Sequence, residues 1–584
     1  MRLASTRCGV RAVQNARLSV RRGHFATRAL EVEAYPIRSS GENILNPFRV
    51  IEQREDTRWT ARTRRNQSVL AEQHADEKQF STHIPFEEHL LNQRKHNQII
   101  KAGDEAGILI SNQPYVFDDQ SNISQSILGM LDRRLYAQPD HPISITRKLI
   151  ESVFPAPQFE NHIAINPVVT TFDNFDALDF PKDHPGRSRT DTYYVNREHV
   201  LRTHTSAHQL SAFGRLAGTR YIKDPSLQNT PSGYTICADV FRRDSIDRSH
   251  MPVFHQMEAA RIWSTELHRG EANGESGLVR RRIERMQKDL QEIPNHGLKV
   301  EDDSPAYNEE TNPKQGEHSP EEVDLMVQHL KRSLETLVAK VFTAAREAGM
   351  GADGTAANEP LKVRWIEAYF PFTAPSYELE VWWQGEWLEL LGCGIVKQGL
   401  LTNAGCADKI GWAWGIGIER LAMLLFGIPD IRLFWSQDPR FLGQFKGGRI
   451  NKFESFSKYP ACYKDVAFWI KPSPAAATPI ADAEVKASAA AAAGGNATKA
   501  NPAEIQPGAF HENDVMEIVR DIAGNLAEDV KLVDEFVHPR TGRKSLCYRI
   551  NYRSLEGTLT NDEVNKMHNE VTARLVQDLN VELR

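Results

Sequence analysis

The sequence predicts an α+β protein of more than one domain, and three observations carry that prediction. Apolar and polar residues alternate through residues 363–396, which is the pattern of strands in an antiparallel sheet. Ser319, Pro320 and Glu322 supply an N-cap, a first-turn proline and a capping box for a long helix, which Gly349 ends. Near the C-terminus the predicted elements run βαββαβ, the order of a ferredoxin-like fold.

The ferredoxin-like order rests on periodicity and on a second capping box, formed by Thr560 and Glu563 at the start of the last helix. A low-complexity, alanine-rich insertion at 472–508 interrupts this domain after its first strand. The six elements are expected, in chain order, at Ala461–Ile470, Glu512–Leu526, Val530–Val537, Leu546–Tyr552, Asn561–Leu579 and Val581–Arg584.

Composition narrows the class of protein. The chain has 584 residues and a net charge of −6, so any nucleic acid must be bound by local basic patches. The longest apolar run, Leu421–Ile428, is far shorter than the roughly 20 residues of a membrane helix, and we expect no membrane insertion. The six cysteines are scattered without a CxxC pair, which favours reduced thiols over disulfides or a zinc site.

The N-terminus has a composition of its own. Residues 1–30 are rich in arginine, include Ser5 and Ser19 and contain no acidic residue, as is typical of a mitochondrial transit peptide. A disordered basic tail that binds RNA is the alternative. Residues 31–112 are polar and lack sustained periodicity, so we expect them to be disordered or irregular.

The remaining chain divides into two predicted domains. Residues 113–445 form the first, with a charged, Gly- and Pro-containing segment at 265–318 expected as an exposed insertion. Residues 446–460 are expected as a linker, and 461–584 form the ferredoxin-like domain.

One hairpin, Phe241–Trp263, concentrates the chemistry. Because strand residues alternate between faces, Phe254, Gln256 and Glu258 share one face and can project with Arg242 into one site. A guanidinium suits a phosphate or carboxylate, an aromatic face suits a base, and an amide with a carboxylate suits an ammonium. The hairpin therefore indicates a site for an amino acid and a nucleotide. The alternative is an ordinary hairpin with paired surface charges.

A second arginine stands out in Gly411–Phe426, a strand that runs into an apolar helix. Arg420 lies one turn inside this helix among apolar neighbours, so we expect it to be buried and to need a partner. That partner is either an internal carboxylate or a bound polyphosphate.

Two further groups of residues have alternative interpretations. His199, His204 and His208 could bind a metal, but no cysteine or carboxylate cluster is nearby, which favours hydrogen bonding to a substrate or the backbone. A basic hairpin in the last domain could follow a phosphate backbone, or it could be an ordinary solvated hairpin. Its candidate RNA-binding residues are Arg540, Arg543, Lys544 and Arg549.

Three stretches together resemble the class II aminoacyl-tRNA synthetases: His204-Thr205-Ser206, Phe241–Glu258 and Gly415–Arg420. The second and third resemble motifs 2 and 3 of that class. Tyr369–Val381 and the C-terminal domain narrow the resemblance to the single-chain mitochondrial phenylalanyl-tRNA synthetases. The resemblance covers residues 113–584 without the two insertions.

The resemblance implies a mostly antiparallel catalytic sheet flanked by helices, and it implies roles for individual residues. Arg242 would contact the ATP α-phosphate and the amino-acid carboxylate, and Arg420 would hold the far end of the triphosphate. Phe254 would stack on adenine beneath a loop that carries Ser249, His250 and Met251. The ammonium would be bound by Ser206, Gln256 and Glu258. The remaining implied site residues are His204, Ala207, His208, Gln209, Phe370, Phe372, Glu389, Gly392, Ala413 and Trp414.

The implied reaction joins L-phenylalanine to ATP, with Mg²⁺, and then to the 2′-hydroxyl of the terminal adenosine of mitochondrial tRNA(Phe). The resemblance also implies a monomer in the mitochondrial matrix. Three alternatives differ in testable ways: a tRNA-independent amino acid ligase, a catalytically dead RNA-binding relative, and a synthetase for another aromatic amino acid.

Overall fold

A computed structural model describes residues 97–102, 104–164, 166–218, 231–264, 275–302, 304–349, 361–383, 386–456, 459–471 and 510–584. The predicted transit peptide, at 1–30, and the low-complexity insertion, at 472–508, lie outside these residues. No helix in the described part of the chain is long and apolar enough to cross a membrane. The five cysteines within it are not joined in disulfides.

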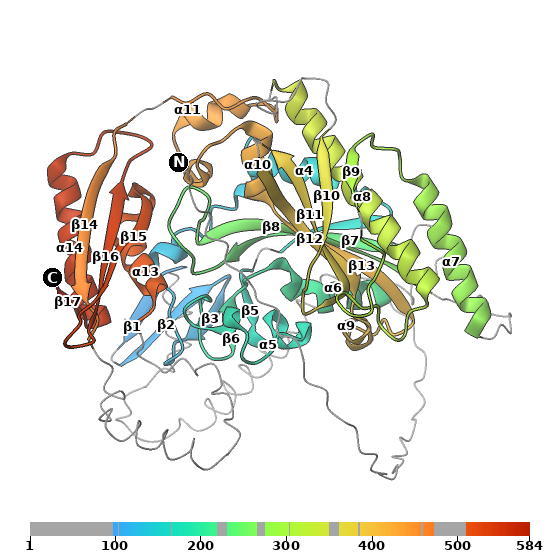
Figure 1. Ribbon diagram of the computed structural model, residues 1–584, viewed down its shortest axis with the longest axis horizontal. Coiled ribbons are helices and arrows are strands. Elements are labelled where there is room, and N and C mark those ends of the chain that lie inside the picture. Colours follow the sequence, from blue (N-terminus) through green and yellow to red (C-terminus); the bar gives the residue numbers. More distant parts are fainter. Residues whose placement is uncertain are drawn as a thin grey trace, which may run out of the picture. The chain divides into compact units, whose positions relative to one another are not determined.

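The first domain is organised around an eight-stranded sheet in the order β4-β7-β8-β13-β12-β11-β10-β9 (Figure 1). Neighbouring strands are antiparallel except at the two edges, where β4 pairs with β7 and β9 pairs with β10 in parallel. The mostly antiparallel sheet that the sequence predicts is confirmed. In sheet order the strands are Phe159–Ile163, Gly233–Phe241, Val253–Ser264, Lys409–Gly417, Glu386–Val396, Thr373–Trp383, Lys362–Glu367 and Lys299–Glu301.

Helices pack on both faces of this sheet. One face, which carries Met257 and Trp414, belongs to the same apolar core as helices α4 (Pro142–Glu151), α8 (Pro320–Glu347) and α10 (Ile418–Phe426). The capping box predicted for α8 is present, with Ser319 as N-cap. The other face, which carries Ala260 and Ala413, forms a separate core with α6 (Gln209–Gly218) and α9 (Gln398–Asn403).

Short elements complete the first domain. Helices α3, α5 and α11 are single turns, and β5 pairs with β6. They lie at Gln125–Leu128, Thr171–Asn174, Pro439–Leu442, Val168–Thr170 and His199–Leu201. Turns of 3₁₀ helix lie at Leu135–Ala137, Asp176–Leu178, Pro185–Arg187, Thr205–His208, Ile431–Trp435 and Gly443–Phe445.

The expectation that residues 31–112 are irregular is wrong for residues 99–112. A three-stranded sheet of β1 (Ile99–Ala102), β2 (Glu105–Ile110) and β3 (Gln113–Val116) begins well before residue 113. Its strands are four to six residues long, too short to give a clear periodicity among their charged neighbours. Burial of Ile108 and Ile110 in the main core stabilises the sheet.

The segment at 265–318 is also more than an exposed insertion. Helix α7 (Glu275–Glu292) packs beside α8, and β9 extends the main sheet (Figure 1). Met286 is fully buried, and the Arg282 guanidinium donates to Glu322 at 2.6 Å in the interior. The expectation was wrong because it rested on the high charge of the segment. A narrow stripe of apolar residues at helical spacing packs α7 onto the domain.

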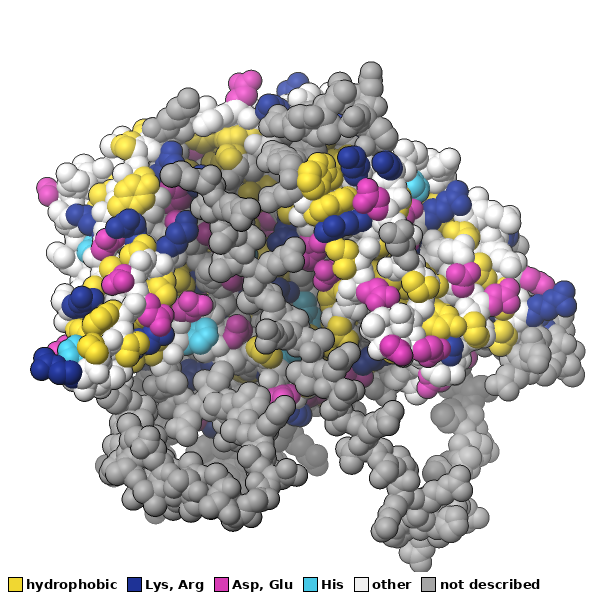
Figure 2. Space-filling model, viewed as in Figure 1, with side chains coloured by type: hydrophobic (Ala, Val, Ile, Leu, Met, Phe, Trp, Pro, Cys, Tyr) yellow, Lys and Arg dark blue, Asp and Glu magenta, His cyan; other side chains and the backbone are white. Residues whose placement is uncertain are grey.

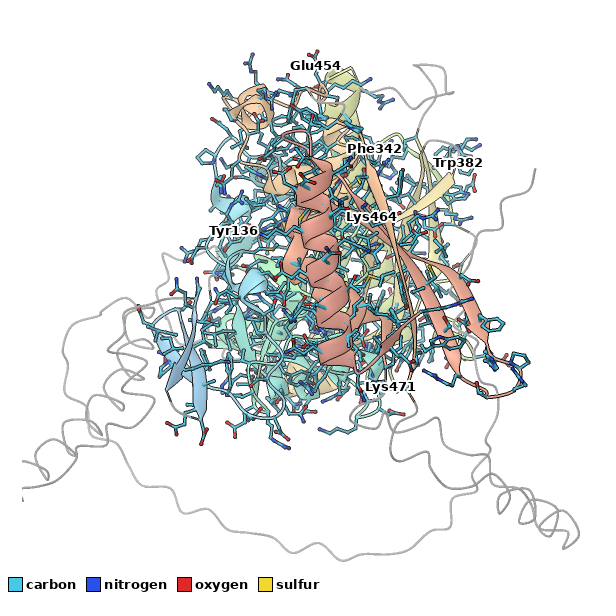
Figure 3. All side chains as sticks on the ribbon, turned by 90° about the vertical axis from the view of Figure 1, so that its left-hand side faces the viewer. Tyr136, Phe342, Trp382, Glu454, Lys464 and Lys471 are labelled. Atoms are coloured by element: carbon cyan, nitrogen blue, oxygen red, sulfur yellow. The ribbon has the colours of Figure 1, made fainter. Side chains whose placement is uncertain are left out.

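The C-terminal domain has the predicted βαββαβ order. Its four-stranded sheet runs β15-β16-β14-β17, and every neighbouring pair is antiparallel. Figure 3 shows α14 running along this sheet beside β14, which contains the labelled Lys464; the labelled Lys471 follows the end of that strand. In chain order the elements are β14 (Cys462–Trp469), α13 (Glu512–Ala523), a 3₁₀ turn (Gly524–Leu526), β15 (Ala527–Val537), β16 (Lys544–Tyr552), α14 (Asn561–Leu579) and β17 (Glu582–Leu583).

Candidate functional site

The hairpin of β7 and β8 has the alternation that the sequence predicts. Phe254 and Gln256 are half-buried on one face of β8, while His255 and Met257 are buried on the other. His255 is held there by Glu419, whose carboxylate lies 2.5 Å from Nδ1 and also accepts the backbone N–H of His255 at 2.8 Å. This buried pair ties β8 to α10 and fixes which face of β8 is turned towards the site.

Glu258 is the most deeply buried acid on the site face, with 1% of its surface exposed. Its carboxylate accepts hydrogen bonds from the Ser206 hydroxyl at 2.9 Å and the Tyr234 hydroxyl at 3.2 Å. Burial raises the pKa of Glu258 to about 7, although the hydrogen bonds, led by that from Ser206, oppose the rise. A cation placed beside this carboxyl would favour its charged form.

Arg242 leaves the end of β7 on the same side of the hairpin. Its Nε donates to the Thr203 carbonyl at 3.0 Å, and its guanidinium lies 5.3 Å from the centre of the Phe254 ring. The residue is accessible to solvent, although the protein packed around it lowers the pKa of its guanidinium, so the rest of the guanidinium can receive an anion. Arg243 points elsewhere, to Asp514 of the C-terminal domain at 3.0 Å, as the strand parity predicts.

The connection between β7 and β8 is organised by Asp247. Its carboxylate accepts the backbone N–H groups of Ser249 and His250, at 2.7 and 2.9 Å, and lies 2.8 Å from His250 Nδ1. The hydrogen bond that the His250 ring donates to Asp247 raises the pKa of His250, while burial and the charge of nearby Arg420 oppose that rise. Met251, in contrast, is buried in the main core and does not line the site.

The segment that contains His204 and His208 closes the site beside Glu258. The His204 ring stacks on Phe180 at 5.5 Å and 3°. Burial, followed by the charge of Arg242, lowers the pKa of His204 to about 3, so this ring is neutral. Within the described part of the chain, both of its buried ring nitrogens lack a well-formed hydrogen-bond partner, which is consistent with a polar ligand at this position.

His208 is fixed by a charge pair that the sequence did not reveal. Its Nε2 lies 2.9 Å from Arg202 Nη1, and Arg202 is buried against Asp239 at 2.5 Å. Burial lowers the pKa of His208 to about 3, so neutral His208 accepts this hydrogen bond. The surroundings of His208 therefore fit the hydrogen-bonding interpretation of this histidine. Gln209 contacts Glu258, whereas Ala207 packs in a separate core behind the site.

The floor of the site is a row of residues across neighbouring strands. Glu258 pairs with Gly415, and Gly415 pairs with Gly392. No described atom lies within 4 Å of where a Cβ would stand at Gly415, so the floor is open there. At Gly392 a Cβ would lie 2.5 Å from Phe370 Cζ, which shows that the Phe370 ring rests directly on this glycine.

Aromatic side chains lie along one side of this floor. The Phe370 and Phe372 rings are 6.2 Å apart and inclined by 22°, and Phe372 also lies 6.2 Å from Phe180. Ala413 is buried in the core that Phe372 packs against, as a small residue at a pocket floor should be. These rings and the alanine provide an apolar surface next to the polar group formed by Glu258 and Ser206.

Two further expectations are corrected. Trp414 does not line the wall, because it lies on the opposite face of β13 and packs on Phe154 at 5.2 Å. Adjacent residues of a strand point to opposite faces of the sheet, so Ala413 and Trp414 cannot both line the pocket. Arg420 is not buried, since its side chain is 48% exposed. It donates to the Glu389 carbonyl at 3.0 Å and is only 3.9 Å from the Glu389 carboxylate.

Carboxylates at the same end of the site could hold a divalent cation. Glu378 pairs with Gly392 and therefore extends the floor row, and Glu389 lies on the neighbouring strand. Burial and then the charge of Glu389 raise the pKa of Glu378, so the two carboxylates are close enough to repel. Hard oxygen ligands of this kind suit Mg²⁺, which commonly takes one or two carboxylates plus phosphate oxygens.

The C-terminal domain presents a second candidate surface, on the face of its sheet away from the helices. Trp469 lies 6.0 Å from Phe536 and 6.1 Å from His538. The guanidiniums of Arg543 and Arg584 lie over the Trp469 ring at 5.3 and 5.7 Å. This group of aromatic rings and arginines, which we call the aromatic platform, was not predicted.

The predicted basic residues of this domain lie around the platform, but most are paired. Arg549 contacts Asp465 at 2.7 Å, Arg543 contacts Glu582 at 2.6 Å and Lys544 contacts Glu535 at 2.9 Å, whereas Arg540 is simply exposed. On the face seen in Figure 2, basic and acidic side chains likewise intermingle over the described surface. RNA binding here would depend on aromatic stacking as well as on charge.

Comparisons with known proteins agree with this arrangement. A family model described as "tRNA synthetases class II core domain (F)" matches residues 128–265 and 321–445, and one described as "Ferredoxin-fold anticodon binding domain" matches residues 505–584. The break in the first match coincides with the segment at 265–318.

Curated relatives match most of the chain. A Saccharomyces cerevisiae protein named "Phenylalanine--tRNA ligase, mitochondrial" is 46% identical over 80% of this chain and 93% of its own length. A Mus musculus protein of the same name is 39% identical over 81% of this chain and 88% of the relative. An Arabidopsis thaliana protein named "Phenylalanine--tRNA ligase, chloroplastic/mitochondrial" is 35% identical, with 86% and 92% covered.

Proposed function

Because this chain belongs to the mitochondrial phenylalanine–tRNA ligases, a family of class II aminoacyl-tRNA synthetases, we propose that the side chains around Arg242, Glu258 and Phe372 activate phenylalanine. The enzyme is an aminoacyl-tRNA ligase that uses ATP to join phenylalanine to tRNA(Phe). Support for the site comes from one observation. An exposed guanidinium, a buried carboxyl and an aromatic group share one side of the same sheet.

In the first step a carboxylate oxygen of phenylalanine attacks the α-phosphorus of ATP, and pyrophosphate leaves. Arg242 would bind both the substrate carboxylate and the α-phosphate, holding them in reach and offsetting the charge that develops. Arg420, with its exposed guanidinium, would bind the terminal phosphates. Phe254 would stack on the adenine beside Ser249 and His250.

The ammonium group of phenylalanine would lie against Glu258, Gln256 and Ser206. Its positive charge would favour the ionised form of Glu258, which would release its proton to solvent, since a pKa of about 7 places the carboxyl between its two forms near neutral pH. His204 and Gln209, which have buried polar atoms without well-formed partners among the described residues, would supply the remaining polar contacts. The phenyl ring would lie between Phe370 and Phe372.

The proposal also covers the residues that would hold a divalent metal, the location of the protein in the cell and its oligomeric state. Mg²⁺ would be held by Glu378 and Glu389 together with the triphosphate, whose charge it would partly neutralise. The protein is mitochondrial, and the acid-free, arginine-rich segment at 1–30 favours import to the matrix. We propose a monomer, as the resemblance to the single-chain enzymes implies.

The experiment that tests the proposed site is amino-acid-dependent exchange of pyrophosphate into ATP, measured without tRNA and with each standard amino acid in turn. Phenylalanine should support the fastest exchange, with tyrosine slower by up to about 10²-fold, because an apolar pocket leaves the tyrosine hydroxyl unpaired. Faster exchange with another amino acid would contradict the assignment of the aromatic pocket, and no exchange with any would contradict an active site.

A substitution at Gly392 tests the pocket floor. Gly392→Ala should raise the phenylalanine KM about tenfold and leave the ATP KM unchanged, because the new methyl group must displace the Phe370 ring. Gly399→Ala is the matched control, since Gly399 has no described atom within 4 Å of its Cβ position and lies outside the site. An unchanged phenylalanine KM in Gly392→Ala would show that Phe370 does not contact the substrate.

For the second step we propose that unpaired bases of the tRNA stack on the aromatic platform. Four-stranded βαββαβ sheets with exposed aromatic residues suit single-stranded RNA, and one stacked base contributes about 1–3 kcal/mol. The ion pairs of Arg543 and Arg549 with carboxylates are exposed, so these arginines can exchange their partners for phosphates at little cost.

Trp469→Ala should raise the KM for tRNA(Phe) about tenfold in aminoacylation, because a stacking surface is lost. Pyrophosphate exchange without tRNA should stay at the level of the unsubstituted enzyme. Phe172→Ala, which removes an exposed aromatic ring from the other domain, is the control. Equal tRNA KM values in the two variants would exclude the platform as a tRNA contact.

A further inference from the structure

The loop between β7 and β8, residues 242–252, is bound to the C-terminal domain through its backbone. The N–H of Val530 donates to the Ile246 carbonyl at 3.0 Å, and Nη2 of Arg520 donates to the Asp244 carbonyl at 2.7 Å. The backbone carbonyls of Asp244 and Ile246, in a loop of the catalytic domain, thus accept hydrogen bonds from the C-terminal domain. Loops on a protein surface usually leave such groups to water.

The Ile246 side chain extends this attachment into the apolar core. It is 8% exposed and belongs to the core of the C-terminal domain, together with Val530 and Ile550. Burying an apolar side chain of this size stabilises the contact. The loop therefore contributes a core residue to a domain that lies far from it in sequence.

A buried carboxylate secures the other half of the loop. Glu528 is 1% exposed and lies 3.0 Å from Arg248, 3.3 Å from Arg553 and 3.5 Å from Arg432. Its second oxygen accepts from Asn551 Nδ2 at 2.6 Å. Because three guanidiniums converge on this one acid, loss of its charge would leave them partly uncompensated.

The residues after Arg248 are those proposed to contact ATP. Asp247 fixes the backbone of Ser249 and His250 directly, and the Arg248 carbonyl accepts the N–H of Ile431 at 2.9 Å. The conformation of Ser249 and His250 thus depends on Asp247 and Arg248, which immediately precede them. A ligand that binds an already ordered loop avoids the entropic cost of ordering it.

We propose that Glu528 of the C-terminal domain is a positioning residue for ATP, because through Arg248 it holds the loop that carries Ser249 and His250. This inference rests on the proposed role of that loop at ATP. Docking of the C-terminal domain and binding of ATP are then linked, and each strengthens the other by the same factor.

The test is pyrophosphate exchange by the full-length Glu528→Gln variant without tRNA. The ATP KM should rise at least about fivefold, while the phenylalanine KM and kcat at saturating ATP stay within about twofold. A loss of folding alone would lower kcat instead. Glu570→Gln, which changes an exposed acid of the same domain, is the control. The ATP KM of Glu528→Asp should lie between those of Glu528→Gln and Glu570→Gln.

An unchanged ATP KM in folded Glu528→Gln protein would overturn the inference. If that variant does not fold, Arg248→Met removes the same bond from the other side and should give the same ATP-specific rise. If the ATP KM rises in Arg248→Met but not in Glu528→Gln, this arginine acts on ATP directly, and that result also contradicts the inference. His250→Ala separates the two claims, because an unchanged ATP KM there would refute the proposed role of the loop itself.

Discussion

Arg242→Ala is expected to lower kcat for phenylalanine-dependent pyrophosphate exchange by about 10²–10³-fold. A donor aimed at charge that develops during a reaction typically contributes that much. Arg242 meets the structural requirement, because its Nε is fixed to the Thr203 carbonyl while the rest of the guanidinium is exposed beside Phe254. The measurement is the exchange rate at saturating ATP and phenylalanine.

The neighbouring arginine supplies the matched control. Arg243 is bonded to Asp514 and to the Arg189 carbonyl, at 3.0 and 2.6 Å, and does not face the site. At saturating ATP, Arg243→Ala should keep kcat within about threefold of the unsubstituted enzyme, since it loses only structural contacts. Equal losses in the two variants would mean that Arg242 also acts only through structure.

Glu258→Gln should raise the phenylalanine KM by at least about 30-fold, because removing one member of a buried charge pair costs about 2–5 kcal/mol. The same variant should be more stable than the unsubstituted protein at pH 8. Burial raises the pKa of this carboxyl from 4.5 to about 7, so the folded state holds the proton more tightly than the unfolded state. Stability therefore falls as pH rises from about 4.5 to 7, by about 2–3 kcal/mol, and glutamine removes that loss.

The pH profile distinguishes a binding role for Glu258 from a purely structural one. In the unsubstituted enzyme the phenylalanine KM should fall as pH rises through about 7, because only the carboxylate attracts the ammonium group. In Glu258→Gln the KM should be high and flat between pH 6 and 8. A variant with a normal KM, or with an unchanged pH profile, would show that the ammonium group binds elsewhere.

Local patterns predicted much of the site, since β-strand parity needs no knowledge of the rest of the fold. Alternation alone placed Phe254, Gln256 and Glu258 together and turned His255 away. The same alternation predicts that Ala413 and Trp414 lie on opposite faces of their strand, although the resemblance implied that both line the pocket. The ferredoxin-like order followed in the same way from periodicity and one capping box.

Other features depend on tertiary packing that periodicity does not contain. Arg420 lies among apolar helix residues, but only the position of α10 at the sheet's end shows that its own side chain reaches solvent. Phe180 and Tyr234 join His204 and Glu258 from segments with no motif of their own. The attachment of Ile246 to the C-terminal domain joins residues almost 300 positions apart in sequence, so no local signal could have revealed it.

The most direct test of the central claim is aminoacylation of mitochondrial tRNA(Phe) by the full-length protein with radiolabelled phenylalanine and ATP. We expect phenylalanyl-tRNA to form, and Arg242→Ala to slow its formation by about 10²–10³-fold. Formation of phenylalanyl-adenylate without any charged tRNA would instead identify a tRNA-independent ligase on the same fold and would contradict the account.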